Sequence, residues 1–126
     1  NKVSPFRVSH AAFSQVDIAP TVVDLLGLDI GSHHFQGKSM FQQTTSNDVF
    51  LVQPYDGIFL SVVNLPYKFG EHLRSGKKYL YNIISDPYEQ KNIYDSHSQI
   101  ASSMQKRLER VYKTNSLIET NKIWNK

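Results

Sequence analysis

Apolar residues recur at every third or fourth position near the start of the chain, which predicts an amphipathic helix from Asp17 to Gly27. The apolar positions of this helix are Ile18, Val22, Leu25 and Leu26. Asp17 is a candidate N-cap, because its carboxylate can accept from backbone N–H groups, and Pro20 lies in the first turn, where a missing N–H costs little. Gly27 predicts the end of the helix, and Asp24 is expected to face solvent. Such a helix needs a larger surface to cover.

The middle of the chain changes to short runs of β-branched and aromatic residues, which are typical of strands. The expected strands are 48–53, 58–63, 67–73 and 78–84, separated by turns at 54–57, 64–66 and 74–77. Because such short connections join antiparallel neighbours, residues 48–84 are predicted to form an antiparallel meander of about four strands. Asp86 and Pro87 then predict a turn in which the aspartate side chain bonds the backbone ahead.

A second amphipathic helix is predicted over residues 96–114. Ser96, followed three residues later by Gln99, forms a capping-box pattern. The apolar face comprises Ile100, Met104, Leu108, Val111 and Tyr112. The opposite face carries Lys106, Arg107, Arg110 and Lys113, which we interpret as a solvated basic surface. This helix is expected to pack on the sheet, whereas the sequence leaves the order of residues 115–126 open.

These elements place the chain in the α+β class, with a small antiparallel sheet of about four strands, a packed C-terminal helix and one preceding helix. Residues 29–47 are rich in Gly, Ser, Gln and Thr and lack a clear period, so they are interpreted as a crossing segment between two structural units. The predicted division is therefore 1–47, with the helix at 17–27, and 48–126, with the meander at 48–84 and the helix at 96–114.

The composition of the chain excludes several classes of function but does not identify one. The 126 residues suffice for one modest core, and the sequence contains neither a cysteine nor an apolar run of membrane-spanning length. Disulfide frameworks and zinc-thiolate sites are therefore excluded. Residues 1–60 carry three basic and five acidic side chains, whereas residues 61–126 carry eleven basic and six acidic side chains. This basic excess is too sparse for a nucleic-acid footprint, and no nucleic-acid partner is expected.

The acidic, histidine and serine residues are the candidates for catalysis or metal binding. Asp17 and Asp24 share a helix face, but capping explains the first and exposure the second. His33 and His34 are adjacent, so their side chains point to opposite faces of an extended chain and do not readily share one metal ion. No serine has a visible histidine and aspartate partner set. The sequence thus predicts no catalytic residue and no metal ligand in this chain.

Three ordered motifs resemble the sulfatases and their relatives in the alkaline-phosphatase superfamily. Ser14-Gln-Val-Asp-Ile-Ala-Pro-Thr-Val-Val-Asp-Leu-Leu-Gly27 is similar to the helix that follows the last metal-binding motif of that family. Gly37-Lys-Ser-Met40 is similar to its G-x-S-L turn. Tyr79-Leu-Tyr-Asn-Ile-Ile-Ser-Asp-Pro-Tyr-Glu-Gln-Lys-Asn92 resembles its L-Y-D-L-x-x-D-P-x-E-x-x-N signature, with Asn82 where the family usually has Asp.

The resemblance implies that the chain is the C-terminal portion of a hydrolase acting on sulfate or phosphate esters. Its first helix would then belong to the catalytic α/β domain, and the apolar face of that helix would either be unusually exposed or pack against a substitute partner within this chain. In the family, the nucleophile and the ligands of a divalent metal (Ca, Mg or Mn) lie upstream of this helix. The chain alone is therefore expected to be inactive, and its first partner is the rest of its catalytic domain.

The same resemblance implies a location on the periplasmic or extracellular side of a bacterial membrane, with any membrane anchor supplied by upstream segments. It also places a basic hairpin near the rim of the parent active site, where it would attract an anionic sulfate or phosphate ester. The residues concerned are Lys68, His72, Arg74, Lys77 and Lys78, together with His10. The alternative for the hairpin is an ordinary charged turn kept soluble by lysine.

Two other functions remain open from the sequence. The residues of the first motif also resemble those of phosphoglycerol and phosphoethanolamine transferases, including lipoteichoic-acid-synthase-like enzymes. The upstream nucleophile would separate the two, because Cys or Ser in a C/S-x-P-x-R motif indicates a sulfatase and Thr a phosphotransferase. The chain could instead be an independent, non-catalytic interaction module, which an upstream reading frame continuous with Asn1 would exclude.

Overall fold

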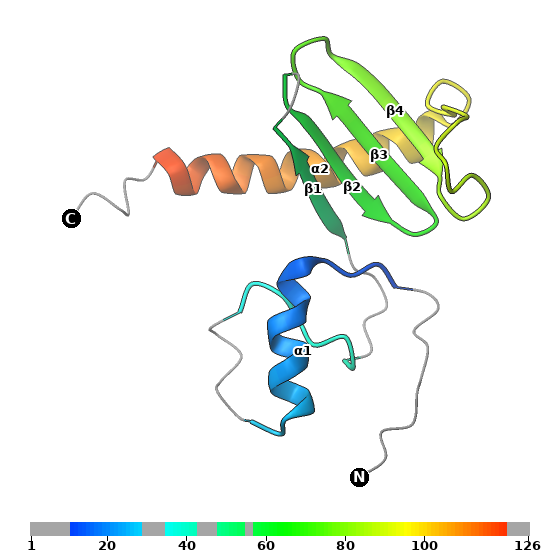
Figure 1. The fold of residues 1–126 in the computed structure, drawn as a ribbon. Helices are drawn as coiled ribbons and strands as arrows, with labels where there is room; N and C mark the ends of the chain where they lie inside the picture. The colour runs from blue at the N-terminus through cyan, green and yellow to red at the C-terminus, as the bar shows by residue number, and fades with distance from the viewer. Residues whose placement is uncertain (1–10, 29–34, 43–47, 55–56, 121–126) are drawn as a thin grey trace. The chain divides into compact units, whose positions relative to one another are not determined.

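A computed structural model describes residues 11–28, 35–42, 48–54 and 57–120, with side chains described as far as Lys113 (Figure 1). The chain divides into two compact units, residues 1–49 and 50–126. The elements are a 3-10 turn at Gln15–Asp17, then α1 (Ile18–Leu25), β1 (Val49–Gln53), β2 (Phe59–Asn64), β3 (Tyr67–His72), β4 (Lys77–Asn82) and α2 (Ser98–Thr120). The predicted α+β class is confirmed.

The end of α1 is set by Gly27, as the sequence predicts. Gly27 adopts a positive φ of 65°, which residues with a Cβ rarely reach. Its N–H donates to the carbonyl of Asp24, and the N–H of Leu28 donates to the carbonyl of Val23. This pair of bonds is a Schellman motif, which satisfies carbonyls that the last helical turn leaves open.

The apolar face of α1 lies in solvent in the described structure. Between 47 and 65 % of the surface of each of its four predicted members, Ile18, Val22, Leu25 and Leu26, is exposed. A soluble protein rarely leaves so many neighbouring apolar side chains uncovered. The expectation of an exposed apolar face is therefore confirmed.

The sheet is a simple antiparallel meander in the order β1-β2-β3-β4. The turn between β2 and β3 contains only Leu65 and Pro66, and the register places Asn64 opposite Tyr67. In the next turn Gly76 adopts a φ of 66° and donates its N–H to the carbonyl of His72. Each predicted strand therefore exists, with ends within two residues of those expected.

The hydrophobic core lies between one face of this sheet and α2, which crosses that face in Figure 1. Its buried members are Leu60, Val62, Phe69, Leu80, Ala101, Met104 and Leu108. The register aligns Val62, Phe69 and Leu80 across three strands, so they form one row against the helix. Burial of this row is the main favourable contribution to folding of the second unit.

Helix α2 differs from its prediction at both ends. The first helical hydrogen bond runs from Ala101 N–H to the carbonyl of His97, so the helix begins after Ser96. The Ser96 hydroxyl instead donates to the carbonyl of Ile93, which makes the predicted capping role wrong. The helix continues to Thr120 because residues 115–120 include neither Gly nor Pro to stop it. Of its predicted apolar face, Tyr112 is exposed.

Candidate functional site

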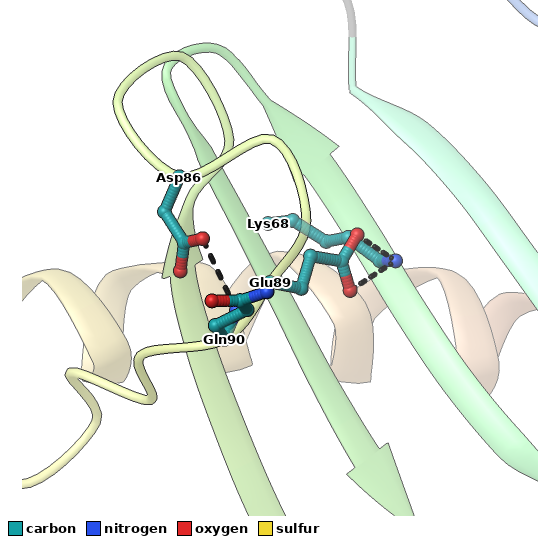
Figure 2. A network of polar contacts seen from close by, with 4 residues as sticks. All are labelled: Lys68, Asp86, Glu89 and Gln90. Carbon is teal, nitrogen blue, oxygen red and sulfur yellow. Dashed lines mark hydrogen bonds and ion pairs between the residues drawn. The ribbon is translucent and has the colours of Figure 1, made fainter.

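The loop that follows β4 is held together by the side chain of Asp86 (Figure 2). Its two carboxylate oxygens accept from the N–H groups of Gln90, at 3.1 Å, and Lys91, at 2.8 Å. The Asp86 carbonyl also accepts from the N–H of Glu89. This is the bonding that an Asp-Pro turn predicts, because a short acidic side chain can replace backbone partners within a turn.

Glu89 connects this loop to the middle of the sheet. Its carboxylate oxygens lie 2.6 and 2.9 Å from Nζ of Lys68 on β3, as Figure 2 shows. Glu89 itself adopts a φ of 55°, a region that non-glycine residues rarely occupy. The ion pair is therefore part of what holds a strained residue in place.

Asn92 attaches the end of the loop to the outer edge of β4. Its Oδ1 accepts from the N–H groups of Leu80 and Tyr94, each at 3.0 Å, and its Nδ2 donates to the carbonyl of Lys78. Ile93 N–H completes the edge by donating to the carbonyl of Leu80. Because an unpaired strand edge invites pairing with other chains, this loop also protects β4.

Asn82 stands where the family signature usually has aspartate. Its hydrogen bonds explain why an amide can replace a carboxylate as the acceptor in this turn. Its Oδ1 accepts from the N–H groups of Ile84 and Ser85, at 3.2 Å each. A carboxylate would offer the same oxygen. The described contacts thus give the polar residues of this signature a structural role, which sequence reasoning identified for Asp86 but not for Asn82, Glu89 or Asn92.

This interpretation predicts unequal effects of two single substitutions. Asn82→Asp should leave the free energy of unfolding within about 0.5 kcal/mol of wild type, because the acceptor oxygen is retained. Asn92→Ala should lower it by about 1–2 kcal/mol, because two backbone N–H groups lose their acceptor. Urea unfolding measures both values, and faster amide exchange at Leu80 in Asn92→Ala alone would locate the effect at the β4 edge.

In the first unit, one face of α1 binds the segment at Lys38–Met40. The carboxylate of Asp17 accepts from Ser14 N–H at 2.8 Å and Lys38 N–H at 2.9 Å, and the Thr21 hydroxyl accepts from Met40 N–H at 2.9 Å. Asp17 is the N-cap residue of α1, as predicted, but its side chain makes no capping bond to α1. Its carboxylate instead completes the capping box of the preceding 3-10 turn with Ser14 and binds Lys38 N–H.

Asp24 completes this contact, one further turn along the helix. Its carboxylate accepts a 2.5 Å hydrogen bond from the hydroxyl of Ser39. Asp24 is exposed, as predicted, but exposure is not its whole role, because its carboxylate also holds Ser39. Asp17 and Asp24 do share a helix face, and that face is used for binding the chain's own backbone and a serine hydroxyl. Neither carboxylate needs a catalytic role to explain its position.

The residues of the predicted basic hairpin lie on different surfaces. The register with the core row puts Lys68, His72 and Lys77 on the sheet face away from α2, whereas Lys78 lies on the α2 face. Arg74 is in the turn, with its side chain beside Gly57. His10 lies outside the described residues.

Most of these hairpin residues have partners within the second unit. Lys68 is paired with Glu89, and Lys78 Nζ donates to Oε1 of Gln105 on α2 at 3.0 Å. The His72 ring nitrogen Nδ1 lies 2.7 Å from the hydroxyl of Ser75. The structure thus brings Lys68, His72 and Lys77 to one face and does not bring all five side chains together. Their role at a substrate rim stays a prediction.

Aromatic side chains cover part of the face that carries Lys68. The rings of Tyr79 and Tyr81 are stacked with centroids 6.3 Å apart, and Phe59 lies 5.7 Å from Tyr79. The Phe59 ring packs directly over Gly70. A Cβ at position 70 would lie 2.5 Å from Cζ of Phe59, so only glycine fits there without a shift of the ring. The Phe59 ring on β2 thus reaches Tyr79 on β4 over Gly70, whereas Tyr79 and Tyr81 are neighbours on one face of β4.

Glu89 also influences the ionisation of Tyr81. Burial raises the pKa of the Tyr81 hydroxyl, and the negative charge of Glu89 raises it further. Glu89→Gln should move this pKa part of the way back towards 10.0, because burial remains. Ring carbon chemical shifts of Tyr81 against pH measure the effect. Asp95→Asn is the control, because it removes a negative charge that does not act on Tyr81. An unchanged pKa in Glu89→Gln would contradict the expectation.

Within the described parts of the chain, three or more His, Asp or Glu side chains do not come together as a metal site. The adjacent histidines at 33 and 34 lie outside those parts. No metal-assisted step is therefore assigned to the described residues. Among the same residues, no helix is both long and apolar enough to cross a membrane.

Comparison with solved structures identifies the class of fold. The chain is similar to a protein from Bacteroides thetaiotaomicron that is assigned to the sulfatases, with a TM-score of 0.58, 21% identity, and coverage of 85% of this chain and 26% of that one. It is similar to BT4656, solved with its substrate D-glucosamine-2-N,6-O-disulfate, with a TM-score of 0.54 and 17% identity over 77% and 23% of the two chains.

A further similar structure is BT1596, a 2-O GAG sulfatase, with a TM-score of 0.52 and 18% identity over 86% of this chain and 25% of that one. No protein-family model matches the sequence, and no curated protein matches it. The resemblance to sulfatases is confirmed at the level of the fold. The chain spans about a quarter of the length of the solved sulfatases that it matches.

Proposed function

We propose that this chain is the C-terminal subdomain of a sulfate-ester hydrolase whose substrate is a sulfated sugar. The observation that carries the proposal is the similarity of fold to sulfatases, which extends over 77–86% of this chain but only about a quarter of theirs. The proposed substrate class is supported by BT4656, whose own substrate is D-glucosamine-2-N,6-O-disulfate. The remainder of the protein would supply the nucleophile and the divalent metal.

The exposed face of α1 supports this proposal independently. A subdomain that normally covers a larger catalytic domain should present an apolar surface when that domain is absent. In the proposed protein, Ile18, Val22, Leu25 and Leu26 pack against the remainder of the catalytic domain. The contacts of Asp17, Thr21 and Asp24 lie on another side of the helix, so they hold the segment at Lys38–Met40 without using this apolar surface.

Leu26→Lys tests this assignment of the α1 face. Leu26 is 65% exposed, so in the 126-residue chain the substitution should change the free energy of unfolding by no more than about 0.5 kcal/mol. In the intact protein the same lysine would be buried without a partner, and the loss should reach about 2–3 kcal/mol. Thermal unfolding of both forms measures the difference. Equal effects in the two forms would contradict the assignment.

The catalytic proposal is tested on the intact protein that contains this chain. We expect it to release inorganic sulfate from D-glucosamine-2-N,6-O-disulfate, to lose this activity with a metal chelator, and to show none when only residues 1–126 are present. Release of phosphate from a phosphate ester, without release of sulfate, would instead indicate a phosphotransferase. Absence of both activities, together with an upstream sequence that lacks a nucleophile motif, would favour an interaction module.

A further inference from the structure

A hollow of about 290 Å³ lies between α2 and the turn that joins β2 to β3. Its apolar lining comes from Ile100 and Met104 on the helix and from the ring of Tyr67 at the start of β3. A volume near 300 Å³ is at the lower end of the range for small-molecule sites. The hollow therefore suits a single ring-sized ligand.

The polar lining of this hollow is rich in hydrogen-bond donors and positively charged. Asn64 and Gln99 supply side-chain amides, Ser103 a hydroxyl and Arg107 a guanidinium group, and no acidic residue lines the hollow. Arg107 is half-buried. A guanidinium group binds sulfate and carboxylate oxygens well because its donors form a planar fork.

A second hollow on the same helix has the opposite character. It measures about 200 Å³, lies beside the loop that follows β4, and is lined by Asp95, Ser98 and Ser102, among others, with no Lys or Arg. An anionic ligand would be repelled there by the Asp95 carboxylate. The two hollows thus offer an internal comparison between a basic and an acidic lining on one helix.

We propose that the hollow beside Arg107 is a binding site for one anionic sugar residue. The sugar ring would lie on Ile100, Met104 and Tyr67, and its sulfate group would accept hydrogen bonds from Arg107. Aromatic and aliphatic surfaces suit the apolar faces of a sugar ring, while the amides and the hydroxyl match its hydroxyl groups. The choice of sulfate over carboxylate rests on the proposed function.

The test is a titration of the 126-residue chain, followed by amide NMR, with D-glucosamine-2-N,6-O-disulfate as the probe. We expect saturable shifts at Asn64, Tyr67, Ser103 and Arg107. Unsulfated, uncharged N-acetyl-D-glucosamine should bind at least about 5-fold more weakly, because it lacks the charge-assisted hydrogen bonds. D-glucuronate, which carries a carboxylate, distinguishes the two anionic groups, and tighter binding of glucuronate than of the sulfated sugar would overturn the choice of sulfate.

Two pairs of variants locate the site. Ser103→Trp fills the hollow and should abolish the shifts, whereas Ser102→Trp alters a neighbouring exposed serine outside it and should leave them unchanged. Arg107→Gln should weaken binding at least about 5-fold, whereas Lys106→Gln, which removes the same charge from an exposed position, should not. Because Ser103 is exposed, its variant is expected to fold even if Arg107→Gln does not.

Several results would overturn the proposal. These are an absence of saturable shifts, shifts centred on another surface, wild-type binding by Ser103→Trp, or equal shifts with inorganic sulfate alone. Each result concerns binding by residues 1–126, which are proposed to be inactive. A failure of sulfate release by the intact protein would refute the proposed function without changing these binding results, so the two failures are distinguishable.

Discussion

Replacing Phe69 with alanine is expected to lower the free energy of unfolding of the second unit by about 3–5 kcal/mol. Phe69 is completely buried in the middle of the row formed with Val62 and Leu80, and its ring also lies 6.3 Å from that of Tyr94. Its removal would leave a cavity against α2 as well as losing apolar burial. This loss approaches the total stability of many small domains, so partial unfolding at room temperature is expected.

Urea unfolding followed by far-ultraviolet circular dichroism measures this loss. Leu73→Ala is the matched control, because Leu73 follows the same strand but is 41% exposed, and its removal should cost no more than about 1 kcal/mol. A similar midpoint for the two variants would show that the row of Val62, Phe69 and Leu80 is not the core of this unit.

Gly37→Ala is expected to destabilise the first unit by about 3 kcal/mol. An added Cβ would lie 2.1 Å from the carbonyl oxygen of Val16 and 2.7 Å from Oδ1 of Asp17. The first of these atoms belongs to the backbone, so the segment would have to move away from α1. That movement would break the bond from Lys38 N–H to Asp17.

Amide hydrogen exchange at Lys38 and Met40 measures this effect. The N–H of Lys38 donates to Asp17, in the 3-10 turn before α1, and the N–H of Met40 donates to Thr21 on α1. Protection at both positions should be lost in Gly37→Ala. Lys38→Ala provides the control, since it keeps the backbone N–H that binds Asp17 and removes an exposed side chain. Retained protection in Gly37→Ala would mean that the close approach to Val16 is not needed for this contact.

The strands and turns were predictable because their signals are local. Short runs of β-branched and aromatic residues mark the strands, and Gly76 and the Asp86-Pro87 pair mark two of the turns. The order of the sheet then follows, since short turns join neighbouring strands. The end of α1 at Gly27 was predictable for the same reason, because a positive φ is a property of one residue and its immediate neighbours.

The contacts that sequence reasoning missed depend on segments that are distant in the chain. The bond from Ser39 to Asp24 and the bond from Lys78 to Gln105 each require a tertiary arrangement that no local pattern encodes. Ala101 was also missed in the core, because alanine carries little apolar area and gives a weak periodic signal, although it lies three and seven residues before Met104 and Leu108. The basic residues of the hairpin are close together in the sequence. Successive side chains of a strand point to opposite faces of the sheet, however, so Lys77 and Lys78 lie on different faces.

The bonds made by Asn82, Asp86 and Asn92 have a consequence for classifying other sequences. Each of these side chains acts chiefly on the backbone of its own loop or of β4, so the described bonds require neither a metal nor a reacting ester. A relative that has lost its nucleophile would still need the same bonds in order to fold. Detecting this signature in a genome therefore reports the shape of a subdomain, and enzymatic competence has to be judged from the upstream motifs.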